Sequence, residues 1–158
     1  MKRVLLIVLC LAFVAVAADA RGIKLCFTDS ASSADIKLAY TDNAVAADMS
    51  VWVGRYAGYT DVDVCFVNWP ISGSYEIELV SSPYQADYTV CLTKSVLSAD
   101  GVLYLSSTAA MADICVGLWD SPATFTKDIY IKGADPKKLS TQTKVAILYL
   151  LDLLHKKS

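Results

Sequence analysis

The chain has 158 residues, of which 55% are hydrophobic and 19% are charged, and its formal net charge is −2. This length corresponds to one domain. The slight excess of acidic residues argues against non-specific nucleic-acid binding, which requires a basic surface.

The first twenty residues have the pattern of a secretory signal peptide rather than of a folded element. Lys2-Arg3 forms a basic start, and residues 4–17 are an apolar segment that is too short to span a membrane. Ala18-Asp19-Ala20 then has the form of a cleavage site. We therefore predict that residues 1–20 are a signal peptide, that cleavage occurs before Arg21, and that the protein is secreted or periplasmic.

One short pattern recurs from residue 22 to about residue 132: a carboxylate followed by apolar residues at alternate positions. Such alternation is typical of a half-buried β-strand, since successive side chains point to opposite faces. The repeated carboxylates, to which we assign a structural role, are Asp35, Asp48, Asp61, Glu76, Asp87, Asp100, Asp113 and Asp128. A ninth copy begins at Gly22 and lacks the acid. The third position after the carboxylate, or after Gly22, is the predicted core, with Leu25, Leu38, Val51, Val64, Leu79, Val90, Leu103, Val116 and Ile131.

The steps between successive carboxylates are 13, 13, 15, 11, 13, 13 and 15 residues. Turn-forming residues separate the strands, and the two 15-residue steps contain Trp69-Pro70 and Ser121-Pro122, where we expect longer loops. One strand and its return loop cannot bury an apolar face alone, so the repeats must fold together. We predict an all-β domain over residues 21–134, made of nine short strands in tandem repeats of about 13 residues.

Residues 135–158 predict a single C-terminal α-helix. Asp135-Pro136 has the form of an N-cap followed by a proline at the first helical position, and Ser140 is a second candidate for the start. The apolar residues Ile147, Leu150, Leu151 and Leu154 lie on one helical face. We expect this helix to pack on the same domain and to cover its core. Closure of the open end of the sheet and formation of a homodimer are the alternatives.

The repeats resemble those of the 7(1) septoil-knot domain family, small β-rich bacterial proteins with tandem units of the form S-x-Y-x-A-D-φ-x-V, where φ is apolar. Residues 82–90, SPYQADYTV, match this unit best. The Ala-Asp pair recurs at Ala34-Asp35, Ala47-Asp48, Ala99-Asp100 and Ala112-Asp113, whereas Tyr75-Glu76 and Lys127-Asp128 depart from it. The resemblance implies a chain that winds repeatedly through itself and implies no activity. A plain β-solenoid and a closed barrel are the alternative architectures.

Four cysteines follow the predicted signal peptide, at Cys26, Cys65, Cys91 and Cys115. An even number of cysteines in an exported chain predicts disulfides. All four lie at even positions of their repeats, so we expect them on the face opposite the Leu/Val core. We favour the pairing Cys26–Cys65 with Cys91–Cys115, and keep Cys26–Cys91 with Cys65–Cys115 as the alternative.

The carboxylates could form a calcium-binding ladder, but calcium needs about six to eight oxygen ligands and each repeat supplies one acid. We therefore expect no metal and no other cofactor, and we expect each carboxylate to accept backbone N–H bonds from the preceding turn. The single histidine, His155, lies at the end of the chain beside Lys156, far from any serine or cysteine motif. This pattern predicts no catalytic residue and no enzymatic activity.

The aromatic residues Trp52, Trp69 and Trp119 are candidates for stacking on a ligand. Two hypotheses about function follow. The first is a non-enzymatic structural or partner-binding module whose protein partner the sequence does not identify. The second is a carbohydrate-binding module that stacks a glycan on these tryptophans.

Overall fold

The structure is a computed structural model that describes residues 22–54 and 60–157. The described chain is mostly β, with nine strands and one α-helix at the C-terminal end, as the sequence predicts. The predicted signal peptide and its cleavage site lie outside the described residues.

The nine strands start at a constant interval. They are β1 (Ile23–Phe27), β2 (Ile36–Tyr40), β3 (Met49–Gly54), β4 (Val62–Val67), β5 (Tyr75–Leu79), β6 (Tyr88–Thr93), β7 (Gly101–Ser106), β8 (Ile114–Trp119) and β9 (Lys127–Lys132). Each strand begins 13 residues after the previous one. The predicted longer loops are therefore wrong, because Glu76 and Asp128 lie at the second position of β5 and β9, whereas Asp35 precedes its strand.

The strands form a closed, all-parallel barrel with the order β1-β5-β9-β4-β8-β3-β7-β2-β6. Each strand lies two places round the ring from the strand before it, so the chain passes round the barrel almost twice. The second passage fills the places that the first leaves between its strands. Paired residues are separated in sequence by 54 or by 63 residues, as in Thr89–Asp35 and Lys24–Asp87. Closure leaves no unpaired strand edge.

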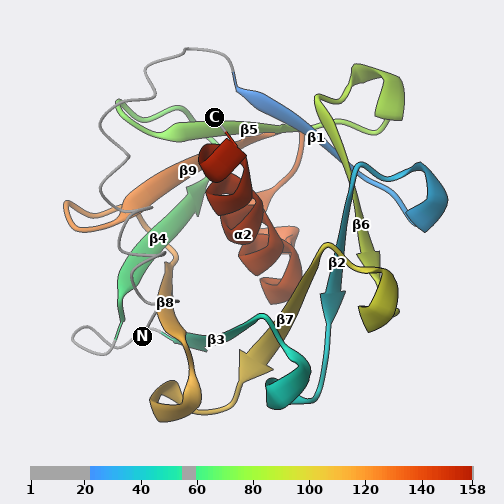
Figure 1. Cartoon of the computed structure of the whole chain (residues 1–158). Coiled ribbons are helices and arrows are strands. Elements are labelled where there is room, and N and C mark those ends of the chain that lie inside the picture. Colours follow the sequence, from blue (N-terminus) through green and yellow to red (C-terminus); the bar gives the residue numbers. More distant parts are fainter. Residues whose placement is uncertain (1–21, 55–59, 158) are drawn as a thin grey trace.

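The connections that are described in full run over the outside of the barrel (Figure 1). Because the next strand is two places away, each of them crosses the strand that lies between. Five connections contain a short 3-10 helix that packs on the crossed strand: η2 (Ala31–Ser33) on β6, η3 (Ala44–Ala46) on β7, η4 (Pro83–Gln85) on β1, η5 (Val96–Ser98) on β2 and η6 (Ala109–Met111) on β3. The outer face of the sheet is thus partly buried, as is usual for parallel sheets.

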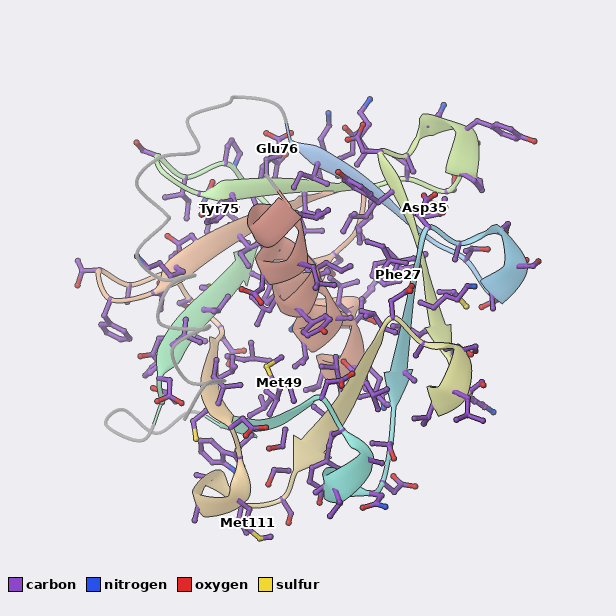
Figure 2. All side chains as sticks on the ribbon, viewed as in Figure 1. Phe27, Asp35, Met49, Tyr75, Glu76 and Met111 are labelled. Atoms are coloured by element: carbon purple, nitrogen blue, oxygen red, sulfur yellow. The ribbon has the colours of Figure 1, made fainter. Side chains whose placement is uncertain are left out.

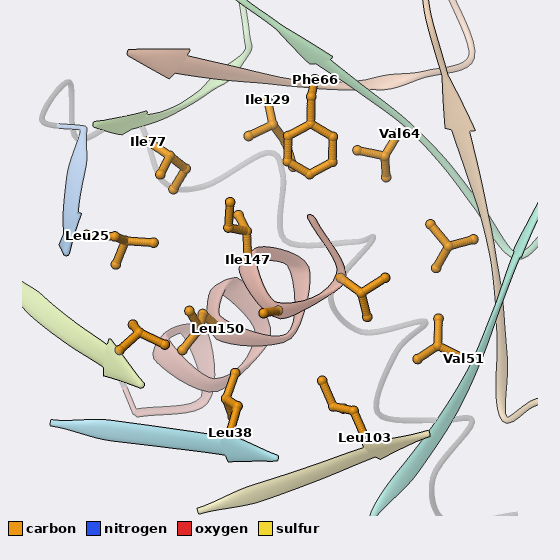
Figure 3. Packing of buried hydrophobic residues seen from close by; sticks show 14 of the residues in the cluster. Leu25, Leu38, Val51, Val64, Phe66, Ile77, Leu103, Ile129, Ile147 and Leu150 are labelled. Atoms are coloured by element: carbon orange, nitrogen blue, oxygen red, sulfur yellow. The ribbon is translucent and has the colours of Figure 1, made fainter. Parts of the chain in front are cut away.

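The odd positions of each strand point into the barrel. The third residues of the nine strands form one buried ring, made of Leu25, Leu38, Val51, Val64, Ile77, Val90, Leu103, Val116 and Ile129, all 0–3% exposed (Figure 3). Seven of these nine are the predicted core residues. The other two predicted residues, Leu79 and Ile131, lie two positions later in their strands, and Ile131 is also buried.

Helix α2 (Thr141–Lys157) lies inside this ring (Figures 1 and 3). Its residues Val145, Ala146, Ile147 and Leu150 are 0–2% exposed. A barrel of about eight strands is just filled by its own side chains, so a wider ring needs additional core material. The helix supplies that material: Ile147 and Leu150 of its apolar face are buried within the barrel, whereas Leu151 and Leu154 are half-buried.

The start of α2 is fixed by two caps and two side-chain contacts. The Asp135 carboxylate accepts the backbone N–H of Lys137 in a preceding 3-10 turn, η7 (Pro136–Lys138), at 3.0 Å. The Ser140 hydroxyl accepts the N–H of Thr143 at 3.1 Å and caps the helix itself. The Tyr40 hydroxyl donates to the carbonyl of Gln142, and the Lys144 amine lies 5.8 Å from the centroid of the Phe66 ring. Each of the two predicted helix starts therefore begins a helical element: Asp135 caps η7, and Ser140 caps α2.

The strand ring is also shaped to receive the helix. Gly101 is the first residue of β7 and is buried. A Cβ atom at this position would lie 2.7 Å from the ring and hydroxyl of Tyr149 on α2. Tyr149 thus occupies the space that a side chain on β7 would otherwise fill.

We predict that Leu38→Ala lowers the free energy of unfolding by about 2–5 kcal/mol, because Leu38 is completely buried between the ring and α2. Lys24→Ala is the matched control, since the Lys24 side chain lies on the exposed outer face of β1 and should change stability by less than about 0.5 kcal/mol. Urea unfolding followed by circular dichroism measures both. Equal stabilities of the two variants would contradict the inward direction of the third position.

Candidate functional site

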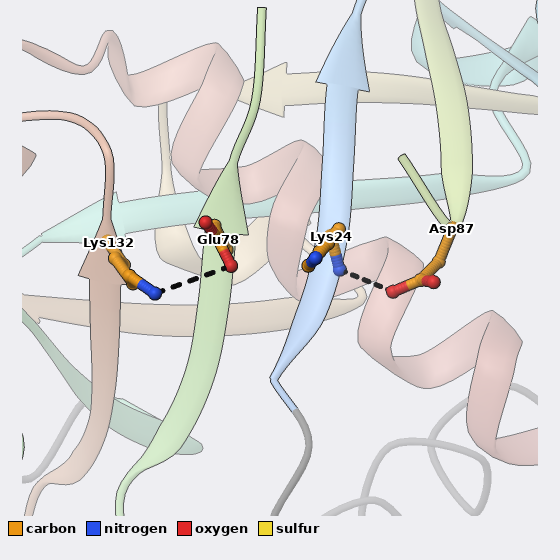
Figure 4. Close-up of polar contacts among 4 residues, drawn as sticks. All are labelled: Lys24, Glu78, Asp87 and Lys132. Carbon is orange, nitrogen blue, oxygen red and sulfur yellow. Dashed lines mark hydrogen bonds and ion pairs between the residues drawn. The ribbon is translucent and has the colours of Figure 1, made fainter. Parts of the chain in front are cut away.

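Six of the repeated aspartates make the same pair of hydrogen bonds. The backbone N–H of each donates to the carbonyl of the second residue of an adjacent strand, and its carboxylate accepts the N–H of that same residue at 2.7–2.8 Å. The pairs are Asp35–Thr89, Asp48–Val102, Asp61–Cys115, Asp87–Lys24, Asp100–Lys37 and Asp113–Ser50. Figure 4 shows the carboxylate of Asp87 beside the Lys24 backbone. The bonds come from the neighbouring strand and not, as we expect from the sequence, from the preceding turn.

Two of these pairs are reinforced by a hydroxyl group. The Thr89 hydroxyl donates to the Asp35 carboxylate at 2.7 Å, and the Ser50 hydroxyl donates to the Asp113 carboxylate at 2.9 Å. The backbone and hydroxyl bonds from Thr89 lower the pKa of Asp35, because both bonds favour the ionised form. Thr89 and Ser50 are buried on the outer face, at 7% and 6% exposure.

Glu76 and Asp128 do not occupy the position of the other six acids. Extending the strand register places Glu76 opposite Gly22 and Asp128 opposite Ser74. In these two pairs the acid is the second residue of its strand, and the residue that precedes the adjacent strand is not acidic. A Cβ atom at Gly22 would lie 2.7 Å from the Glu76 side chain, which confirms that the two residues are adjacent.

The remaining pair follows the same rule. Thr126 precedes β9, and Asp63 lies opposite it on β4. All nine pairs, one for each repeat, therefore contain one carboxylate and only one. A second acid would place two negative charges across a strand pair, which is unfavourable. The nine carboxylates thus lie in a ring, and six of them bond the backbone of the neighbouring strand.

An ion pair also joins two neighbouring strands on the outer face. The Glu78 carboxylate lies 3.6 Å from the Lys132 amine on the neighbouring strand β9 (Figure 4).

Within residues 22–54 and 60–157, no group of three or more histidine, cysteine or acidic side chains could hold a metal ion. No helix in this part of the chain is long and apolar enough to cross a membrane.

The predicted disulfides are not formed. Cys26, Cys65, Cys91 and Cys115 are all free thiols. The favoured pairing is ruled out by topology, because β5 and β9 lie between Cys26 and Cys65, and β3, β7 and β2 lie between Cys115 and Cys91. Three strand spacings are about 14 Å, whereas a disulfide needs Cα atoms within about 7 Å.

The alternative pairing also fails. Cys65 is in register with Trp119, four residues beyond Cys115 on the same strand. Cys26 is in register with Thr89, two residues before Cys91. In both cases the stagger along the strands separates the two cysteines, although the strands themselves are neighbours.

A requirement for small residues explains the cysteines. Cys26, Cys65 and Cys91 occupy the fourth position of their strands, on the outer face beneath a crossing connection, and are 0–3% exposed. Ala39 and Gly117 occupy the same position in β2 and β8 and are buried as well. Cysteine behaves here as a small apolar residue. Their location on the face opposite the Leu/Val core agrees with the strand phase.

The three tryptophans lie in different surroundings. Trp52, on β3, folds over its own chain, since a Cβ atom at Gly54 would overlap its ring. The Trp119 indole donates to the Asp63 carboxylate at 2.7 Å and meets the Phe125 ring edge-on, with 5.1 Å between centroids. Only Trp69 is more than half exposed, at 51%. Two of the three candidate rings are therefore packed against other residues on the outer face of the barrel.

The structure reveals an exposed apolar surface that the sequence analysis does not single out. Four large side chains project from the tips of the 3-10 turns, with exposures of 94%, 100%, 100% and 73% for Val45, Tyr84, Leu97 and Met111 respectively. We call these four residues the turn-tip surface; Figure 2 shows Met111 at the outer edge of the barrel. Val45, Tyr84 and Leu97 share one position of the 13-residue repeat, which is the signal that could have found them.

The turn-tip surface extends over one continuous arc of the barrel. The turns η6, η3, η5, η2 and η4 pack on β3, β7, β2, β6 and β1, which are five consecutive strands in the ring. Four of these five turns carry a member of the turn-tip surface, and η2 carries Ser32 at its centre. Residues from distant repeats are thus brought to one side of the molecule.

No protein-family model matches this sequence, and comparisons with curated proteins and with solved structures find no significant match.

We predict that the Asp35 carboxylate stabilises the fold above about pH 4, the ordinary pKa of an aspartate, and that this contribution is lost as the pH falls toward its lowered pKa in the folded protein. Asp35→Asn should therefore lower stability at neutral pH and flatten the acid side of the stability profile. Urea midpoints between pH 7 and pH 2.5 measure this, with the exposed Asp29→Asn as control. Parallel profiles for Asp35→Asn and the unmodified protein would contradict the assignment.

We also predict that all four barrel cysteines react with iodoacetamide in urea without prior reduction and that none reacts rapidly in the folded protein. Burial raises the pKa of the Cys65 and Cys115 thiols and so further reduces the reactive thiolate. Peptide mapping by mass spectrometry identifies each modified cysteine. A disulfide-linked peptide from protein that has not been reduced would contradict the free thiols.

Proposed function

We propose that this protein is a non-enzymatic partner-binding module that presents the turn-tip surface on a rigid barrel. The observation that carries the proposal is the exposure of Val45, Tyr84, Leu97 and Met111 along five consecutive strands. Two other large apolar side chains, Trp69 and Phe125, are 51% and 56% exposed and lie outside this arc. Single exposed apolar residues of that kind are common, whereas four strongly exposed ones on one arc are typical of an interaction site.

The construction of the turns supports this proposal. Each turn packs on the strand that it crosses and ends two residues before a repeat aspartate, whose hydrogen bonds hold the chain to the neighbouring strand. The turn of Val45 is additionally capped by the Asn43 side chain, which accepts the Val45 N–H at 3.0 Å. Side chains held in fixed positions lose less conformational entropy when a partner binds.

The class and location of the protein are proposals as well. We propose membership of the septoil-knot group on the strength of the Ala-Asp strand units and the tandem 13-residue repeat. We propose export to the periplasm or the medium, and this rests on the pattern of residues 1–20 alone, since the barrel cysteines form no disulfide.

Site-specific photocrosslinking tests the partner-binding proposal. We predict that a benzophenone amino acid at position 97 gives a discrete crosslinked species in the native medium or envelope of the protein. The same group at position 132 should not, because Lys132 is exposed on β9, outside the arc of the turn-tip surface.

The same experiment has a second arm. The double substitution Val45→Ser and Tyr84→Ser should remove the adduct formed at position 97. It should change the free energy of unfolding by less than about 0.5 kcal/mol, because neither side chain is packed. Equal crosslinking at positions 97 and 132, or an adduct that survives both serine substitutions, would overturn the proposal.

A further inference from the structure

Helix α2 does not fill the barrel evenly. A cavity of about 110 Å³ lies between the helix and the inner faces of β4, β8 and β3, which are neighbours in the ring. Its floor is made of Val51, Val64 and Val116, each 1–3% exposed. The side chain of Met49 enters it from the start of β3 and points toward α2 (Figure 2).

The sequence explains why the cavity lies on this side. The third-position ring carries valine on β3, β8 and β4, whereas five of its other six members are the larger leucine and isoleucine. Because valine is shorter than leucine or isoleucine, three adjacent valines leave space between the ring and α2 on this side. An enclosed apolar cavity of about 150 Å³ accepts benzene. The space beside α2 is smaller but open on one side, so it has room for the apolar end of a ligand that extends out through the mouth.

The mouth of the cavity differs chemically from its floor. Tyr149 and Asp152, both partly exposed, line it from one face of α2 that also includes Val145 and Leu148. Burial raises the pKa of the Tyr149 phenol, and the negative charges of Asp48, Asp152 and Asp100 raise it further. Among the described residues, Asp152 is the charged one that lines the cavity. An apolar space that opens at a carboxylate matches a molecule with an apolar body and a positive charge at one end.

We propose that this cavity binds a small amphiphilic cation, with its apolar body between α2 and the three valines and its protonated amine at Asp152. The proposal is independent of partner binding through the turn-tip surface, which lies on the outside of the barrel. The competing ligands are a neutral apolar molecule and an amphiphilic anion. They differ from the proposed ligand in charge, so a comparison of affinities can tell the three apart.

Three probes of similar size and different charge test the proposal: 2-phenylethylamine, 2-phenylethanol and 3-phenylpropionate. Methyl NMR of the protein should show the amine shifting the signals of Val51, Val64 and Val116. We expect the amine to bind about tenfold more tightly than the alcohol, the contribution of one hydrogen bond to a charged group. The propionate should bind more weakly than the alcohol, and added salt should reduce the differences.

Asp152→Asn should remove the advantage of the amine over the alcohol and leave the affinity for the alcohol unchanged. Asp29→Asn is the matched control, since it removes one exposed acid from the β1–β2 connection and should change neither affinity. Val116→Leu, which reduces the free volume, should weaken binding of all three probes.

Two results would overturn the proposal. The first is the same affinity for the amine in the unmodified protein and in Asp152→Asn. The second is a titration in which the amine saturates shifts elsewhere in the methyl spectrum but shifts none of the signals of the three valines.

Discussion

The structure depends on hydrogen bonding between parallel strands that lie 54 or 63 residues apart in the sequence. No strand pairs with the strand before or after it. The strands β1–β4 therefore have no partners among themselves, and each acquires its partners only when the second half of the chain enters the places between them. Such non-local pairing makes the barrel cooperative and predicts slow folding compared with proteins that have local contacts.

The strand pattern and its inward face could be predicted from alternation alone, because one side of each strand must be apolar. The 13-residue interval is hidden in β5 and β9. In these two strands the repeated acid is the second residue of the strand and not the residue that precedes it. Glu76 and Asp128 are therefore correct as repeated acids and misleading as markers of strand starts. Only the register, which joins residues far apart in the sequence, reveals the exchange.

The remaining differences have similar causes. The number and spacing of cysteines indicate a disulfide protein, but the crossing connections require small side chains at Cys26, Cys65 and Cys91, and this requirement is visible only in three dimensions. The apolar face of α2 predicts a covering helix, yet its position inside the ring depends on barrel width. The turn-tip surface could be predicted in part from the sequence, since Val45, Tyr84 and Leu97 share a repeat position. The adjacency of their turns could not, because it depends on the order of the strands round the ring.

The winding of the chain also restricts how such a protein can change in length during evolution. A step of two places visits every position of a closed ring only when the number of strands is odd; with an even number, the second passage would arrive at places that the first already occupies. A single duplicated or deleted repeat therefore yields no closed barrel of this kind, although the repeats are nearly interchangeable in sequence. Repeats can be gained or lost only in twos, and each such change must also alter the space available to the helix inside.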